Sequence, residues 1–177
     1  MTAREELPLL GACVVAAHNL EEALTGPAWL REHSANAHIL GLQVPLVPDR
    51  TAYVALALVT LFSWLWIGAA CRSQPRSLGA YSVLALFGVY LGNAFVPHVV
   101  ATLLLRAYVP GVITAVLGVI PFVLLFLSVG IRTGRYTRRG AGVTLVLAFT
   151  AYAAAGLLAR WLLRAGLAVS GAGGPAG

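Results

Sequence analysis

Lysine is absent from this chain of 177 residues, and charge of either sign is scarce. Only 10% of the residues are charged, whereas about a quarter are charged in a typical soluble domain. The twelve basic residues are all arginine, and they lie at the ends of apolar runs rather than along one stripe. The formal net charge of +6 therefore does not indicate a nucleic-acid surface, and we expect no nucleic-acid partner.

Several common chemical motifs are also missing. The two cysteines, Cys13 and Cys71, fall in different apolar runs, which suggests neither a disulfide nor a thiolate metal site. The chain has no Walker loop, no CxxC pair and no dinucleotide fingerprint. Glu5 and Glu6 near the N-terminus argue against a secretory signal peptide, which needs a basic start.

What the chain does have is apolar sequence, which makes up 59% of its residues. Several runs approach or exceed the roughly 20 residues that a helix needs to cross a bilayer. We therefore predict an all-α integral membrane helical bundle, with one domain over 1–165 and a flexible tail over 166–177. About five membrane-spanning helices are expected, at 7–25, 51–71, 80–105, 111–131 and 141–159.

The segment 26–50 is too polar to span a membrane, and its mixture of apolar and charged residues suits an interfacial helix and loop. The arginines predict the orientation. With five spans, one side of the membrane would hold seven: Arg4, Arg72, Arg76, Arg132, Arg135, Arg138 and Arg139. The other side would hold five: Arg31, Arg50, Arg106, Arg160 and Arg164. Because cytoplasmic loops are enriched in basic residues, a cytoplasmic N-terminus is predicted.

The first predicted span contains an unusual polar group, "HNLEE" at 18–22. His18, Glu21 and Glu22 stand at helical positions i, i+3 and i+4 and so share one face. Glu21 and Glu22 are the only carboxylates in any predicted span. A charge near the bilayer centre costs about 2.5–3.5 kcal/mol even on the lenient insertion scale, and such residues usually mark function.

The third predicted span supplies partners at a similar depth, namely Asn93 and His98, with Tyr90 one turn before Asn93. Asn93 and His98 are five residues apart, which separates them by about 140° on an ideal helix. Pro97 removes one helical hydrogen bond, and we expect a local wide turn there to swing His98 toward the face of Asn93.

This set of residues supports more than one chemistry. His18, Glu21, Glu22 and His98 are ordinary ligands for Zn²⁺, Fe²⁺ or Mn²⁺, while carboxylates with the Asn93 oxygen suit Mg²⁺ beside a phosphate substrate. Without a metal, a His–Glu pair in a dry pocket is a good general acid and base. A purely structural polar contact between the first and third spans is the remaining alternative.

At these residues the chain resembles the HXXEE-motif family of small prokaryotic membrane proteins. "HNLEE" at 18–22 is the naming motif, Asn93 with His98 resembles the family's Asn-to-His motif with one extra residue of spacing, and "YVPG" at 108–111 resembles its Tyr-x-Pro-Gly motif. The resemblance implies a multi-span protein of a prokaryotic cell membrane with an active site at these residues, but it implies no settled reaction.

Four further residues are predicted to bind substrate. Tyr90 and Tyr108 are the aromatic candidates, although an interfacial tyrosine is usually an anchor. Arg31 and Arg106 would share one membrane face and could clamp a phosphate, although snorkelling arginines are common there.

We therefore expect a membrane-embedded enzyme that acts on a lipid or isoprenoid-type substrate, with a divalent metal and with Glu21, Glu22, His18, His98 and Asn93 as catalytic residues. Its partners would be the lipid bilayer and a lipophilic small molecule. A metal-free acid/base cyclase or isomerase is the first alternative. A proton or metal-ion transporter is the second, for which a homodimer would supply the symmetry that the chain lacks. A structural or assembly subunit is the third.

Overall fold

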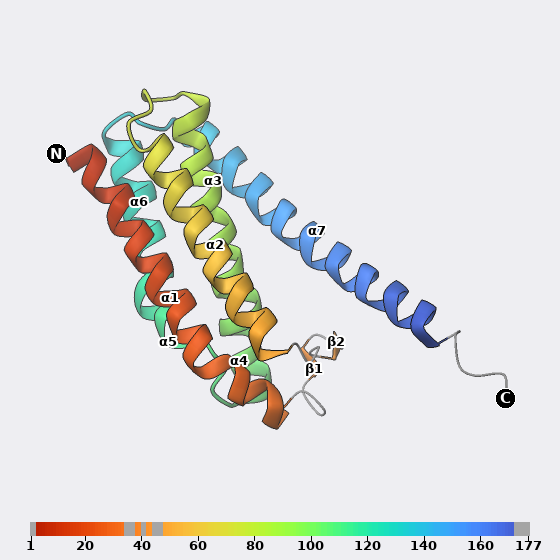
Figure 1. The fold of residues 1–177 in the computed structure, drawn as a ribbon. Helices are drawn as coiled ribbons and strands as arrows, with labels where there is room; N and C mark the ends of the chain where they lie inside the picture. Colours follow the sequence, from red (N-terminus) through yellow and green to blue (C-terminus); the bar gives the residue numbers. More distant parts are fainter. Residues whose placement is uncertain (1–2, 34–37, 40–41, 44–47, 172–177) are drawn as a thin grey trace, which may run out of the picture.

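A computed structural model describes residues 3–33, 38–39, 42–43 and 48–171; these form helices joined by short turns, with one pair of two-residue strands (Figure 1). Three elements are single, uninterrupted α-helices: α1 (Ala3–His33), α2 (Asp49–Ala70) and α7 (Arg138–Gly171). The helix that was predicted as the third span is built from α3 (Leu78–Asn93), the π-helix η1 (Ala94–Val100) and α4 (Ala101–Leu105). The helix that was predicted as the fourth span is built from α5 (Val112–Thr114), the π-helix η2 (Ala115–Val119) and α6 (Ile120–Arg132). Strands β1 (His38–Ile39) and β2 (Leu42–Gln43) pair antiparallel, with His38 opposite Gln43. The predicted all-α class is thus confirmed.

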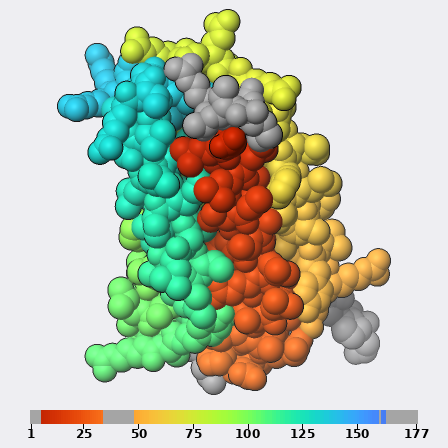
Figure 2. Space-filling view, turned by 90° about the vertical axis from the view of Figure 1, so that its left-hand side faces the viewer, coloured from red at the N-terminus to blue at the C-terminus, as the bar shows by residue number. Residues whose placement is uncertain are grey.

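Four helices in the described part of the chain are long and apolar enough to cross a membrane, where about five were predicted. They are Asp49–Ala70, Leu78–Leu105, Val112–Arg132 and Arg138–Ala159. The first predicted span, α1, is not in this set, and its apolar stretch is interrupted by the polar run 18–22. It nevertheless packs against the bundle, lying between α2 and α6 on the face that Figure 2 shows.

The first helix continues to His33, well past the predicted end at residue 25. The additional turns are held by a small apolar cluster in which Trp29 packs with Ala101 and Val109. The start of the predicted interfacial segment is therefore part of α1, while its residues 34–37, 40–41 and 44–47 lie outside the described chain. Residues 172–177 of the predicted tail lie outside it as well, and α7 runs through Gly171.

The helices alternate in direction along the bundle (Figure 1). One end holds the N-terminus and the turns α2–α3 and α6–α7, and the other holds the strands and the loop between α4 and α5. The last helix, α7, packs against α3 near its start and then leans away from the bundle (Figure 1). The core cluster is aromatic in the half near the N-terminus, where Phe87, Phe122, Phe126 and Tyr136 are buried.

Two spans switch from α-helical to π-helical hydrogen bonding in the half near the α4–α5 loop. The first π-helix, η1, contains Pro97, which confirms the predicted wide turn. In such a turn the hydrogen bonds join residues five apart, so that residues i and i+5 come onto one side. Asn93 and His98 have this spacing, and their side chains meet.

Candidate functional site

Three potential ligand atoms converge where α1 meets η1. The Glu22 Oε1 atom lies 2.9 Å from His98 Nε2 and 3.8 Å from His18 Nε2. All three atoms lie within 4.8 Å of one another, and the two imidazole rings meet edge to face with centroids 4.8 Å apart. His18 is fully buried and His98 nearly so, whereas the Glu22 side chain is 20% exposed. We call His18, Glu22 and His98 the triad; Glu22 is its most exposed member.

Asn93 joins the two histidines of the triad. Its amide nitrogen lies 3.2 Å from His18 Nε2 and 3.1 Å from His98 Nε2, so its two N–H groups can serve both rings. Its carbonyl oxygen accepts a hydrogen bond from the Tyr152 hydroxyl at 3.0 Å. The Tyr152 contact fixes the orientation of the amide, because a hydroxyl that donates requires the oxygen on its side.

The contacts of the triad leave one interaction that needs a positive partner. If His98 Nε2 uses its one lone pair to accept a hydrogen from Asn93, it carries no hydrogen to donate to Glu22 Oε1, which is also an acceptor. Two acceptors 2.9 Å apart require a proton or a cation between them. The other ring nitrogen, His98 Nδ1, is buried and has no hydrogen-bond partner among the described residues.

Glu21 is adjacent to Glu22 in sequence but occupies a separate environment. Its Oε1 accepts from the Tyr108 hydroxyl at 2.7 Å and from the Ile113 N–H at 3.3 Å. Its Oε2 accepts from the Thr114 N–H at 2.8 Å and from the Thr114 hydroxyl at 2.6 Å. The Glu21 carboxylate therefore satisfies the free N–H groups at the start of the fourth span, and it is not among the atoms that converge in the triad.

The "YVPG" motif places a glycine directly beneath the triad. Gly111 has φ +88°, a left-handed conformation that glycine adopts without strain. A Cβ atom at this position would lie 2.7 Å from His98 Cε1 and 3.1 Å from Glu22 Cγ. The motif thus brings backbone against the His98 ring where a side chain would not fit.

None of the four predicted substrate-binding residues belongs to the triad. Tyr90 is buried and its hydroxyl lies 2.9 Å from that of Ser63. Arg31 forms an ion pair with Asp49, and Arg106 is exposed with φ 50° at the end of α4. Tyr108 is 40% exposed and donates to Glu21. Burial is the largest cause that raises the pKa of Tyr108 above its ordinary value, and the Glu21 carboxylate adds to this.

Sequence reasoning missed two residues of the site, Thr114 and Tyr152. Thr114 lies three residues after Gly111, and its hydroxyl contacts both Glu21 and His18. Its position just after the "YVPG" turn was a usable signal. Tyr152 lies in α7, far from every motif, and the sequence offers no signal that it contacts Asn93.

The fold and the site define a class of helical protein with membrane-length helices and a buried His/Glu/Asn cluster. Residues 9–126, about two thirds of the chain, match the family model described as "protein of unknown function with HXXEE motif". The chain belongs to this HXXEE family. It is also similar to the protein named "Uncharacterized protein YrkK" from Bacillus subtilis (strain 168), with 26% identity over 107 residues. The match covers 60% of this chain and 63% of that relative. No solved structure matches the chain.

Proposed function

We propose that this protein is a membrane-embedded, metal-dependent enzyme that acts on a lipid or isoprenoid-type substrate. The observation that carries the proposal is the convergence of His18 Nε2, His98 Nε2 and Glu22 Oε1 within 4.8 Å at a partly exposed carboxylate. Most of the cluster is buried in a bundle of membrane-length helices, where unpaired charge is costly, so a positive partner between these atoms is expected.

The donor atoms fit a divalent metal ion. Two imidazoles and one carboxylate are the protein ligands of several catalytic zinc sites, which keep a further position open for water or substrate. Ligand atoms about 2.0 Å from a tetrahedral metal stand roughly 3.3 Å apart, and the contacts of Glu22 with the two histidines bracket that distance. Iron and manganese accept the same donors. A cation held here would take the Nε2 lone pairs that the Asn93 amide contacts in this structure, so Asn93 would have to turn away from the two rings. The cation would supply Lewis acidity and an activated water, and the released Asn93 amide would position the substrate.

The position of the site along the axis of the bundle, close to one end, favours an amphiphilic substrate. His98 lies seven residues before the end of α4 at Leu105, which is about 10 Å of helix, and Thr114 lies about 3 Å from the start of α5. In our proposal α1 is a fifth span with its N-terminus in the cytoplasm, as the arginines indicate. The cluster would then lie just below the far interface of the cell membrane, where lipid headgroups meet their chains.

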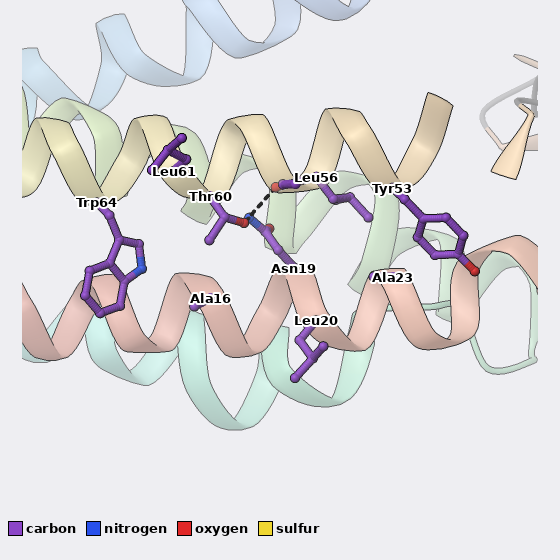
Figure 3. A pocket seen from close by; sticks show the side chains of 10 residues that line it. Ala16, Asn19, Leu20, Ala23, Tyr53, Leu56, Thr60, Leu61 and Trp64 are labelled. Atoms are coloured by element: carbon purple, nitrogen blue, oxygen red, sulfur yellow. Dashed lines mark hydrogen bonds between the residues drawn. The ribbon is translucent and has the colours of Figure 1, made fainter. Parts of the chain in front are cut away.

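A groove between α1 and α2 supports a lipophilic ligand (Figure 3). It encloses about 520 Å³, and Tyr53 and Trp64 stand at its two ends. Its floor holds the hydrogen bond from Asn19 to Thr60, which is 2.6 Å long (Figure 3). Because Asn19 follows His18 directly in α1, a lipid chain in this groove would lie beside the turn of helix that carries the triad.

Metal content tests the first part of the proposal. The protein, purified without chelators, is expected to hold about one equivalent of zinc, iron or manganese by elemental analysis. The Glu22→Gln and His98→Gln variants are expected to lose it. Glu32→Gln and His33→Gln are matched controls at more exposed positions of α1 and should retain it. Equal metal content in Glu22→Gln and Glu32→Gln would refute the metal site.

Turnover of membrane lipids tests the second part. Wild-type protein reconstituted with a total membrane lipid extract and the metal should deplete one lipid class and generate a product, as measured by untargeted mass spectrometry. Glu22→Gln should abolish the change, and Glu32→Gln should not. Identical lipid profiles for wild type and Glu22→Gln would argue against an enzyme of this kind.

A metal-free acid/base enzyme, such as an isoprenoid cyclase or isomerase, is the second candidate. It is favoured by the direct contact of 2.9 Å between Glu22 Oε1 and His98 Nε2, which a single proton could bridge. The two experiments separate the candidates, because this one predicts lipid turnover that depends on Glu22 in protein that contains no metal.

A further inference from the structure

The His18 ring nitrogen that points away from the triad is held by a hydroxyl. His18 Nδ1 lies 2.9 Å from Thr114 Oγ1, and this hydroxyl lies 2.6 Å from Glu21 Oε2. The three groups come from the first helix and from the start of the fourth span, and they form one continuous line of contacts ending at the Glu21 carboxylate.

The chemistry of this line sets the position of each hydrogen. A hydroxyl has one hydrogen to donate, and the short contact with Glu21 is the stronger, charge-assisted use of it. Glu21 Oε2 also receives the backbone N–H of Thr114, so this carboxylate oxygen acts as an acceptor on both sides. The Thr114 hydroxyl must then accept from His18, which requires a hydrogen on His18 Nδ1.

We infer that Thr114 and Glu21 are positioning residues that hold His18 in its Nδ1–H tautomer, with the lone pair of Nε2 directed into the triad. This assigns different tasks to the two adjacent glutamates of the motif. Glu22 offers its carboxylate to the triad, and Glu21 acts on His18 through Thr114. The arrangement follows the general pattern in which a histidine ligand donates its other N–H to a fixed acceptor.

The inference rests on the proposed function only where it makes His18 Nε2 a metal ligand. The tautomer of His18 is a property of the metal-free protein. It is therefore tested there first, by ¹⁵N NMR of histidine-labelled protein, in which His18→Gln assigns the His18 signals. The wild type is expected to show one protonated nitrogen, Nδ1, and one unprotonated nitrogen, Nε2. A wild-type ring protonated on Nε2 alone would overturn the inference, whatever the variants do.

Substitutions at Thr114 distinguish the effect of its hydroxyl from the effect of its packing. Thr114→Val keeps the shape but not the hydroxyl, and it should give a mixture of tautomers at His18. Thr114→Ser restores the hydroxyl and should restore the wild-type spectrum. Thr144→Val is the matched control, because the Thr144 hydroxyl donates to a backbone carbonyl of its own helix and is remote from the triad. An unchanged His18 spectrum in Thr114→Val would overturn the inference.

Metal binding gives a second measurement, and a negative result there would count against the proposed metal function rather than against the tautomer. Removal of such an outer partner typically weakens metal affinity by about 10–100-fold, and this loss is expected for Thr114→Val but not for Thr114→Ser or Thr144→Val. The visible spectrum of bound Co²⁺ should change in Thr114→Val as well. If wild-type protein binds no metal while the tautomer result holds, the proposed metal function fails and the positioning role of Thr114 stands.

Discussion

The same helices carry different kinds of side chain in the two halves of the bundle. In the half near the N-terminus, α3 and α6 contribute Phe87, Phe122 and Phe126 to an aromatic cluster whose ring centroids are 4.8–5.9 Å apart, with Phe87 edge-on to both other rings. In the other half the same two spans, with α1, present the triad, Asn93 and Thr114. The first half contains aromatic packing, and the second contains nearly all of the buried polar chemistry described above.

Helix geometry changes at the boundary between these halves. Among the described residues, both π-helices, η1 and η2, lie in the polar half, and the aromatic cluster lies on regular α-helix. π-helical turns are rare in proteins and are found frequently at functional sites. The comparison indicates that the aromatic half supplies stability, which allows the polar half to hold side chains and backbone in arrangements that packing alone would not favour.

The largest expected effect is on stability, from the aromatic half. Phe87 is 1% exposed and contacts both Phe122 and Phe126, so Phe87→Ala should lower the free energy of unfolding by about 3–5 kcal/mol. Any metal that the proposed site binds per folded molecule should not change in amount, because Phe87 does not contact the triad. Denaturant unfolding in detergent and elemental analysis of the folded fraction measure the two quantities.

Phe62→Ala is the matched control for this substitution, because Phe62 is 53% exposed on α2. It should cost far less than Phe87→Ala. Equal destabilisation by the two variants, or loss of metal from folded Phe87→Ala, would show that stability and metal binding are not assigned to separate halves of the bundle.

Much of the polar half could be predicted from the sequence, because two effects have strong local signals. Carboxylates inside an apolar run are costly, which singled out Glu21 and Glu22. The similar depth of the two polar sets, at 18–22 and at Asn93 and His98, predicted that the first and third predicted spans meet there. Proline inside a helix removes a hydrogen bond, which predicted the wide turn at Pro97.

The remaining features depend on contacts between elements that sequence spacing does not fix. Glu21 and Glu22 looked equivalent in the motif, and only the approach of the fourth span, with the N–H groups of Ile113 and Thr114, distinguishes them. Tyr152 comes from a helix with no motif. The extension of α1 to His33 depends on the packing of Trp29 against distant residues.

The next effect concerns the backbone under the triad. Gly111→Ala should cost about 1–2 kcal/mol because of its left-handed conformation, and the added Cβ would press on the His98 ring. We expect metal affinity to fall by about 10–100-fold, as for other outer contacts of a metal ligand. Competition with a chelating dye measures the affinity.

Gly142→Ala is the control, because a Cβ there meets no atom within 4 Å. It lies inside α7, where alanine favours the helix by up to about 1 kcal/mol, so stability should stay equal or rise while metal affinity is unchanged. Wild-type affinity in Gly111→Ala would mean that the backbone under His98 does not shape the polar half.

The smallest effect lies at the edge of the polar half, where Tyr108 donates to Glu21. Tyr108→Phe should lower stability at neutral pH by about 0.5–1.5 kcal/mol through the lost hydrogen bond, with Tyr53→Phe on exposed α2 as the control. Burial raises the pKa of Tyr108 above its ordinary value of 10.0 in the folded protein. The stabilisation by Tyr108 is therefore fully present at a pH below the ordinary pKa, and it is lost as the pH rises through the higher pKa of the folded protein. Above that pKa, a Tyr108 phenolate would face the Glu21 carboxylate. The difference in unfolding free energy between wild type and Tyr108→Phe should shrink in this alkaline window. A difference that stays constant or grows there would mean that Tyr108 titrates independently of Glu21 and that the ordered contacts around the triad end at Thr114.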